Sequence, residues 1–414
     1  MGLAALMRLW PAIGLLLAAC AGSAPTAQPE PPGPPAVPTT VETPDVAAGN
    51  RAFGVDLYRQ LAAEPGNVFI SPISIAGAFG PVTAGAQGDT QAEINKVLRF
   101  PGGDALHPRL GGLLRGLERD EDGARVTIAN ALWVAQDFPI KKAFVDTATD
   151  NYGAEVANLD FRNGAAAAGR INEWVERETK RRVRNLISPR SLNARTVLVV
   201  TNAVHFLGDW TEPFETRHTR PLPFYLDGGT SRDVPMMSDI RTVRYAEPGD
   251  VQVIDLPYKG ERLSMSVILP KRRGGLREVE GRLDDRLLGR WLAALDAAPV
   301  REVQIFLPKV TVESAYQLVE PLKAMGMVVP FYPSRSNFRG IAEAPLVITQ
   351  AVHKTYLRVD EKGTEAAAAT GIGIEVTGAR IGPPTVFRAD HPYLLLIRDK
   401  PSGAVLFLGR IAAP

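Results

Sequence analysis

Apolar residues recur at helical spacing early in the folded part of the chain. Phe53, Leu57 and Leu61 are four residues apart, so they lie on one face of a helix. Residues 73–86 are apolar or small throughout, which predicts a buried helix. Residues 167–180 combine spaced apolar residues with charges, which predicts an amphipathic helix.

The second half of the chain has the pattern of strands. Residues 196–200 are a β-branched run, and residues 263–269 alternate so as to give one strongly apolar face. Two apolar runs, 393–397 and 404–408, flank the turn-forming residues 399–403 and predict a deeply buried hairpin. Helices followed by strands predict the α+β class.

The segment 364–377 alternates in character over its whole length. One set is small or β-branched and never charged: Thr364, Ala366, Ala368, Thr370, Ile372, Ile374 and Val376. The other set holds both glutamates and both glycines: Glu365, Ala367, Ala369, Gly371, Gly373, Glu375 and Thr377. In a strand the two sets face opposite sides. The segment is either a flexible connector between Val359 and Phe387 or an exposed segment that becomes a strand later, and the persistent alternation favours the second.

The N-terminus has the pattern of an export signal. Residues 1–19 carry one basic residue, Arg8, before the apolar run 9–17, which is too short to span a membrane. Cys20, the single cysteine, follows two alanines as in a bacterial lipobox, which predicts lipidation; the alternative is an ordinary signal peptide and a chance cysteine.

Residues 20–44 are rich in proline and predict a tether that reaches roughly 60–70 Å. A protein lipidated at Cys20 is held at the bacterial cell envelope, at the outer membrane in a Gram-negative cell. Without that lipid it is extracellular. The folded domain is expected from residue 45 to residue 414.

Composition excludes several classes of function. The chain has 414 residues, a formal net charge of +2 and 45% hydrophobic residues, which is typical of a globular protein. This charge balance argues against a nucleic-acid partner, which requires a basic excess.

The usual signatures of catalysis and of metal binding are missing from the sequence. The histidines are His107, His205, His218, His353 and His391, and none stands in a zinc motif, so no metal and no cofactor is expected. The G-x-S-x-G motif, which carries the nucleophilic serine of many hydrolases, is also missing. The alternative that the chain is a lipoprotein hydrolase therefore has no recognisable set of catalytic residues to support it.

Several motifs together resemble one family, the serpins (serine protease inhibitors). Residues 361–371, EKGTEAAAATG, match the hinge of the serpin reactive loop nearly residue for residue. Other matching segments follow in family order: 67–74, 202–210, 234–237, 256–260 and 389–393. The resemblance covers the whole domain after the tether. It implies a monomer with about nine helices around three β-sheets and an exposed reactive-centre loop.

The resemblance also implies a function without enzyme activity. A target serine protease attacks the loop and forms an acyl-enzyme, and the cut loop then inserts into a sheet and distorts the protease. Counting from Glu361 places the reactive bond at Thr377–Gly378, which suits elastase-like or subtilisin-like enzymes. Cleavage after Arg380 is the alternative, and it would suit trypsin-like enzymes.

The resemblance assigns roles to further residues. The hinge comprises Glu361, Gly363, Thr364, Glu365, Ala366, Ala367, Ala368, Ala369 and Thr370. The "shutter" is a group of polar residues beneath the sheet, at the place where its strands part. It comprises Ser71, Ser74, Asn202 and His353. The alternative interpretation is that each is an ordinary buried polar residue with its hydrogen bonds satisfied. Trp210 matches the tryptophan of the "breach", where the loop first enters the sheet. The alternative interpretation is that it is an ordinary aromatic residue of the core.

Two alternatives remain open at this point. A non-inhibitory serpin that acts as a binding or scaffold protein usually has charged or bulky residues, or proline, in the hinge, and this hinge has none. The basic run 180–184 suggests either a polyanion cofactor or a solvated helix end, and we prefer the helix end.

Overall fold

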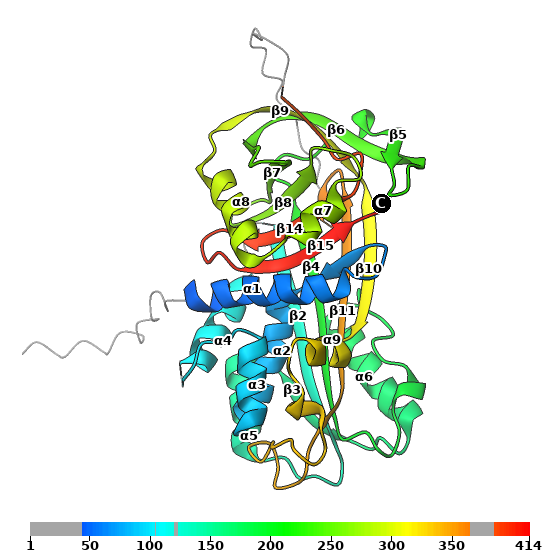
Figure 1. Ribbon diagram of the computed structural model, residues 1–414. Coiled ribbons are helices and arrows are strands. Elements are labelled where there is room, and N and C mark those ends of the chain that lie inside the picture. Colours follow the sequence, from blue (N-terminus) through cyan, green and yellow to red (C-terminus); the bar gives the residue numbers. More distant parts are fainter. Residues whose placement is uncertain (1–43, 104, 120–122, 365–384) are drawn as a thin grey trace, which may run out of the picture. The chain divides into compact units, whose positions relative to one another are not determined.

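The computed structural model describes residues 44–103, 105–119, 123–364 and 385–414 (Figure 1). These described residues form one compact unit. Its described residues contain nine α-helices: α1 (Pro44–Leu61), α2 (Pro72–Gly85), α3 (Asp89–Val97), α4 (Leu106–Leu117), α5 (Lys142–Tyr152), α6 (Gly164–Glu178), α7 (Leu276–Gly281), α8 (Asp285–Ala297) and α9 (Val319–Ala324). The predicted signal peptide, Cys20 and tether residues up to 43 lie outside the described residues.

A six-stranded sheet forms the centre of the unit. Its strands in spatial order are β10 (Val310–Gln317), β11 (Ile348–Asp360), β12 (Gly363–Thr364), β4 (Leu198–Asp209), β2 (Ala124–Ala135) and β3 (Glu155–Leu159). β11 and β4 also pair directly with each other, in parallel. Long β4 and β2 run antiparallel side by side (Figure 1).

The remaining strands form a second, nine-stranded network. In spatial order they are β1 (Val68–Ile70), β15 (Val405–Ile411), β14 (Tyr393–Asp399), β8 (Leu263–Pro270), β7 (Val251–Pro257), β6 (Ser231–Ala246), β9 (Val300–Pro308) and β13 (Thr385–Arg388), with β5 (Arg220–Tyr225) beside β6. One end of β6 pairs with β7 and the rest pairs with β9. Two of the three sheets that the resemblance implies are therefore joined through β6.

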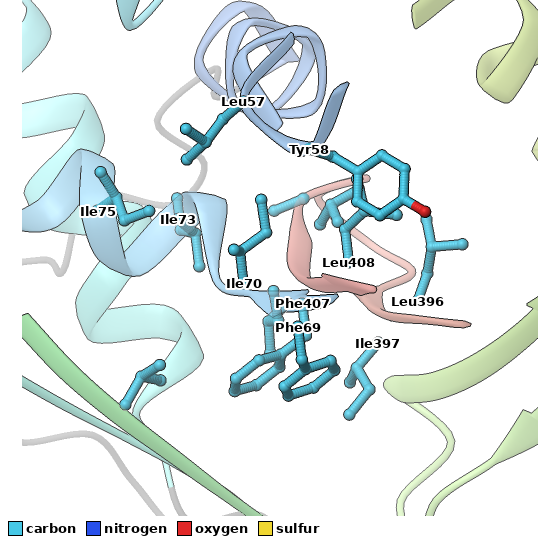
Figure 2. Close-up of a cluster of buried hydrophobic side chains, with 14 of the residues drawn as sticks. Leu57, Tyr58, Phe69, Ile70, Ile73, Ile75, Leu396, Ile397, Phe407 and Leu408 are labelled. Atoms are coloured by element: carbon cyan, nitrogen blue, oxygen red, sulfur yellow. The ribbon is translucent and has the colours of Figure 1, made fainter. Parts of the chain in front are cut away.

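The core lies on both faces of the six-stranded sheet. The larger cluster joins α1 and α2 to the hairpin β14–β15, and its Phe69 and Phe407 rings stack 5.0 Å apart (Figure 2). The smaller cluster lies under α6, where Trp133 of β2 meets Trp174 edge to face at 5.5 Å. Aromatic pairs of this geometry add about 0.5–1.5 kcal/mol beyond area burial.

Most of the elements expected from the pattern are present. α1, α2 and α6 are the three predicted helices, and α2 is buried along nearly its whole length. β14 and β15 are the predicted buried hairpin. Two expectations need correction. β8 is buried on both faces, and β4 continues to Asp209, well beyond residue 200.

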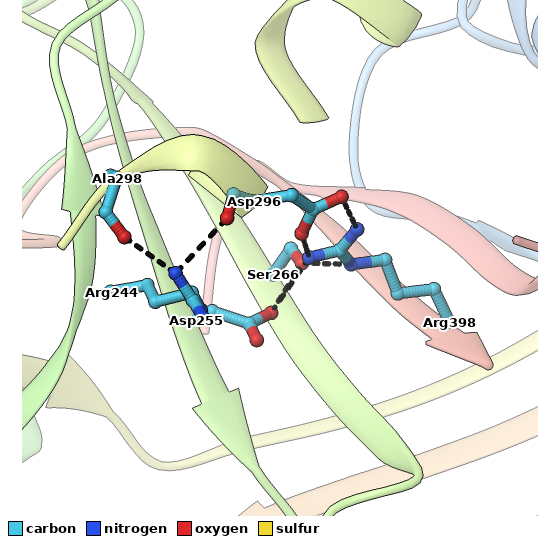
Figure 3. Close-up of polar contacts among 6 residues, drawn as sticks. All are labelled: Arg244, Asp255, Ser266, Asp296, Ala298 and Arg398. Atoms are coloured by element: carbon cyan, nitrogen blue, oxygen red, sulfur yellow. Dashed lines mark hydrogen bonds and ion pairs between the residues drawn. The ribbon is translucent and has the colours of Figure 1, made fainter. Parts of the chain in front are cut away.

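A buried ionic network explains the polar face of β8. Ser266 donates a hydrogen bond to Asp255 of β7 at 2.9 Å and accepts one from Arg398 of β14 at 3.1 Å (Figure 3). Arg398 also binds Asp296 at the end of α8, where Arg244 donates to the Asp296 carbonyl at 3.0 Å. The network thus attaches α8 to the sheet.

We expect Arg398→Met to destabilise the protein strongly. Asp255 is only 4% exposed, and removing its cation leaves a buried charge that typically costs about 3–5 kcal/mol. The free energy of unfolding measured in urea checks this. Arg277→Met on the exposed face of α7 is the matched control. Adding Asp255→Asn to Arg398→Met should restore part of the loss, and an unchanged loss would contradict the charge-based explanation.

Candidate functional site

The candidate site is the seam between β4 and β11. These strands pair directly from Ile348 opposite Leu198 to Tyr356 opposite His205. Beyond that pairing they are separated by β12: Thr364 lies opposite Gly208 of β4 and Val359 of β11. The chain that follows β11 has therefore entered the sheet for two residues, and residues 365–384 lie outside the described residues.

Glycine is required at position 363 because β12 lies very close to the backbone of β4 there. Its φ is +154°, and a Cβ built there would lie 2.0 Å from the carbonyl oxygen of Gly208. Real Cβ atoms do not approach so closely, so a larger residue would push β12 away from β4. Gly363 of the predicted hinge is thus explained by backbone contact.

Glu361 ties the turn before β12 to its surroundings. Its carboxylate accepts bonds from Lys309 Nζ at 2.8 Å and Thr219 Oγ1 at 2.9 Å, and its carbonyl accepts one from Phe214 N at 2.7 Å. Burial alone would raise the pKa of Glu361, but the hydrogen bonds from Lys309, its own backbone and Thr219 outweigh burial and lower the pKa. The carboxylate is therefore ionised at neutral pH.

Trp210 and Tyr258 line the place where β12 enters. Trp210 Nε1 donates to the carbonyl of Asp360 at 3.0 Å, and its ring stacks on Tyr258 at 4.6 Å. The Tyr258 hydroxyl bonds the hydroxyl of fully buried Thr364 at 2.7 Å. The predicted breach residue Trp210 therefore contacts the turn that carries the hinge. Because Thr364 is buried, the set of alternating residues that begins with Thr364 is the one that faces inward.

The four predicted shutter residues lie together beneath the seam. His353 of β11 accepts a hydrogen bond at Nε2 from Ser71 N at 3.0 Å and contacts Asn202 Oδ1 through Nδ1 at 2.5 Å. Asn202 of β4 also donates to Ser74 at the start of α2. The imidazole is thus neutral, with its proton on Nδ1.

The network has a fifth member that the sequence analysis missed. Asn130 of β2 lies opposite Asn202 and accepts a hydrogen bond from it at 2.6 Å. The available signal was an asparagine within the apolar run 128–134 of a strand. Three strands and α2 are therefore linked by one buried polar cluster.

The buried histidine should make stability depend on pH. Burial lowers the pKa of His353 to about 3, whereas an unfolded histidine has a pKa of about 6.5. The unfolded state therefore binds a proton first as pH falls, so the contribution is complete above about pH 6.5 and is lost progressively below it. From pH 6.5 to 4.5 we expect a loss of about 2–3 kcal/mol.

Thermal unfolding of His353→Gln tests this expectation. Between pH 6.5 and 4.5 its Tm should fall by about 3–4 °C less than the wild-type Tm, because carboxylates with a lowered pKa, such as Glu361, weaken both proteins alike. His218→Gln, at an exposed position, is the control and should retain the wild-type pH dependence. Equal pH dependence of His353→Gln and wild type would contradict the assignment.

Comparisons with known proteins agree with this arrangement. A protein-family model described as "Serpin (serine protease inhibitor)" matches residues 48–414. The chain belongs to the serpin family. The leukocyte elastase inhibitor of Sus scrofa is 35% identical over 379 residues, covering 89% of this chain and 99% of that protein. A serpin-like protein of Thermococcus kodakarensis is 37% identical over 378 residues, covering 90% of this chain and 86% of that protein.

Solved structures show the same fold. The serpin described as highly specific in the insect Tenebrio molitor superposes with a TM-score of 0.82 at 30% identity, covering 91% of this chain and 100% of that one. The predicted serpin resemblance and the α+β serpin fold are thus confirmed. Serpins are protease inhibitors and generally not catalysts.

Several predicted site residues lie outside the described residues. These are Glu365 to Thr370 of the hinge, Thr377 and Gly378 of the reactive bond, the alternative Arg380, and Cys20. Among the residues that the structure describes, no cluster of His, Cys, Asp or Glu could hold a metal ion. No helix in the described part of the chain is long and apolar enough to cross a bilayer.

Proposed function

We propose that this serpin is a suicide inhibitor of serine proteases whose loop, once cut, inserts between β4 and β11. One observation carries the proposal: β12 has entered the seam at its open end, while the rest of the seam is closed by direct β4–β11 pairing. A strand that continued beyond Thr364 would replace this single ladder by two antiparallel ladders.

The register of β12 gives the positions of the inserted residues. Antiparallel pairing continued from Thr364 and Gly208 brings Ala366 opposite Phe206, Ala368 opposite Val204, and Thr370 opposite Asn202. On the β11 side the same continuation brings Thr370 opposite His353. The residues of the inward-facing set are small or β-branched, so they fit between large buried neighbours. Thr370 would bring its hydroxyl to the buried polar cluster that contains Asn202 and His353.

The covalent step balances without a cofactor. The serine hydroxyl of the target protease attacks the carbonyl carbon of Thr377, and an ester bond to that carbon forms as the peptide bond to Gly378 breaks. The serine proton passes to the new amine of Gly378. The protease remains trapped only if the loop inserts faster than the ester is hydrolysed.

The target class follows from Thr377. A small β-branched residue before the cut, preceded by Val376, suits elastase-like or subtilisin-like pockets, and the relative from Sus scrofa is named as an elastase inhibitor. Cleavage after Arg380 would instead suit trypsin-like enzymes.

Incubation with elastase-like, subtilisin-like and trypsin-like proteases tests mechanism and register together. We expect a complex that survives denaturation, with mass spectrometry placing the ester at Thr377. Cleavage without any such complex would overturn the proposal in favour of a non-inhibitory serpin that acts as a binding or scaffold protein. A complex formed only after Arg380 would correct the register and the target class.

We further propose that Cys20 carries lipid and holds the monomer at the bacterial cell envelope. The lipobox-like residues before Cys20 and the proline-rich residues up to 44 support this location. Fractionation of an expressing bacterium should find the protein with membranes, and Cys20→Ser should release it. A protein that stays soluble with Cys20 intact would contradict lipidation.

A further inference from the structure

A pocket of about 290 Å³ lies where α5, α6, β2 and β3 meet. β3 pairs with β2 only from Glu155 opposite Ala131 onward, so within the described chain no strand lies beside the earlier residues of β2 on this side. The pocket occupies this open part of the sheet edge. None of the described residues that line it belongs to the hinge, the breach or β12.

Much of the wall of this pocket is apolar. Ile128 of β2, Val145 of α5 and Val156 of β3 line it, and each of these side chains is only half-buried. Trp174 of α6 adds an aromatic side chain to the same wall. Apolar surface that is left incompletely covered in a pocket favours the hydrocarbon part of a ligand.

The ionisable side chains that line the pocket are both acidic. They are Glu155, at the start of β3, and Glu178, at the end of α6, and no Lys, Arg or His is among the described lining residues. Glu155 has no ion-pair partner within the described part of the chain. Glu178 lies 2.9 Å from Arg177, but both side chains are exposed, so this pair contributes little. The pocket therefore carries negative charge that the protein itself does not neutralise.

The open edge of β2 adds a further hydrogen-bond acceptor. Ile128 N donates to Glu118 Oε1 at 3.2 Å, so the backbone groups of Ile128 point away from β4. The carbonyl oxygen of Ile128 points out of the same edge. Two carboxylates and a carbonyl thus make the pocket rich in acceptors.

We propose that this pocket binds a small aliphatic diamine, whose ammonium groups face Glu155 and Glu178 while its methylene chain lies on the apolar wall. An ammonium group has three donors and no acceptor, which matches a pocket rich in acceptors. The volume of the pocket is at the lower end for ligand sites, which suits a small ligand. A metal ion does not fit, because no cluster of acidic residues and histidines in the described chain could hold one.

Calorimetric titration of the purified protein with cadaverine, a diamine with a chain of five carbons, tests this site. We expect one molecule to bind per chain, about tenfold more tightly than pentylamine, which has the same carbon chain but a single ammonium group. Pentanol, which has no charge, should not bind measurably, and the affinity for cadaverine should fall as salt rises. Equal affinity for cadaverine and pentylamine would overturn the pairing of two ammonium groups, and no binding of cadaverine would overturn the site.

Neutral substitutions identify the carboxylates. Glu155→Gln keeps the shape of a half-buried side chain and removes its charge, so the affinity for cadaverine should fall about tenfold. Glu178→Gln should lower it by only about threefold, because Glu178 is exposed and shared with Arg177. Glu173→Gln is the matched control, since Glu173 is exposed on α6 but does not line the pocket. Equal weakening by Glu155→Gln and Glu173→Gln, or none by Glu155→Gln, would overturn the site.

A further variant fills the pocket without changing its charge. Thr149 of α5 lines the pocket and is exposed, so Thr149→Phe adds bulk there without disturbing a buried side chain. It should weaken cadaverine binding at least about tenfold. Ala143→Phe, at an exposed position of α5 that does not line the pocket, is the control and should bind as wild type does. Undiminished binding by Thr149→Phe would show that the amine binds elsewhere.

Thermal unfolding gives an independent readout. Saturating cadaverine should raise the Tm of wild type, because a ligand that binds only the folded state stabilises it, and the rise should be smaller in Glu155→Gln. An equal rise in both proteins would contradict binding at Glu155. These measurements use no protease, so failure of the site and failure of the proposed inhibition are distinguished.

Discussion

Ala368→Arg should convert the protein from an inhibitor into a substrate. Continued pairing from β12 places residue 368 opposite Val204 of β4 and Thr355 of β11, both fully buried. An arginine there must bring an unpaired guanidinium into the core, which costs several kcal/mol, and each increase of about 1.4 kcal/mol in a barrier slows the step about tenfold. Insertion should then lose the competition with hydrolysis of the acyl-enzyme.

The measurement is the fraction of protease recovered in the denaturation-resistant complex. It should fall at least about tenfold, while the rate of loop cleavage stays near that of wild type. Glu365→Arg is the matched control, because its register neighbours are half-buried Leu207 and exposed Arg358, where a long side chain extends into water. Equal loss in both variants, or no loss in Ala368→Arg, would show that the inward set is assigned to the wrong face.

The sequence pattern predicted elements whose buried faces are apolar. α2 and the hairpin β14–β15 have few polar residues, so local pattern and tertiary burial agree. The length of β4 was underestimated because two polar residues, Thr201 and Asn202, interrupt its apolar run. Their hydrogen bonds are satisfied only by partners from elsewhere in the fold. The two buried faces of β8 were missed for the same reason, since Arg398 binds Ser266 from a distant part of the chain.

The candidate site was predicted from resemblance and not from periodicity. Ser71 and His353 are 282 residues apart, and no local pattern indicates that they meet. Asn130 was missed because the matched motifs did not include its strand. Gly363 is a different case, because its need for glycine arises from the approach of Gly208, which only the paired strands reveal.

A clean cut after residue 377 should make the protein more stable. A metalloprotease, which forms no acyl intermediate, can cut the loop without being trapped. The freed segment then replaces one parallel ladder by two antiparallel ones, a net gain of about ten hydrogen bonds at about 1 kcal/mol each. A domain of about 370 residues gains roughly 0.8 kcal/mol per kelvin in unfolding entropy, so the Tm should rise by more than about 10 °C.

Scanning calorimetry of cut and intact protein measures this rise, with mass spectrometry confirming the position of the cut. The cut Ala368→Arg variant is the control, because its segment cannot insert past residue 368 without burying the charge, and its Tm should remain near that of the intact form. An unchanged or lower Tm for the cut wild type would mean that the closed β4–β11 seam is already the most stable arrangement of this sheet. In that case cleavage would release no energy to move a protease, and the proposed inhibition would lose its driving force.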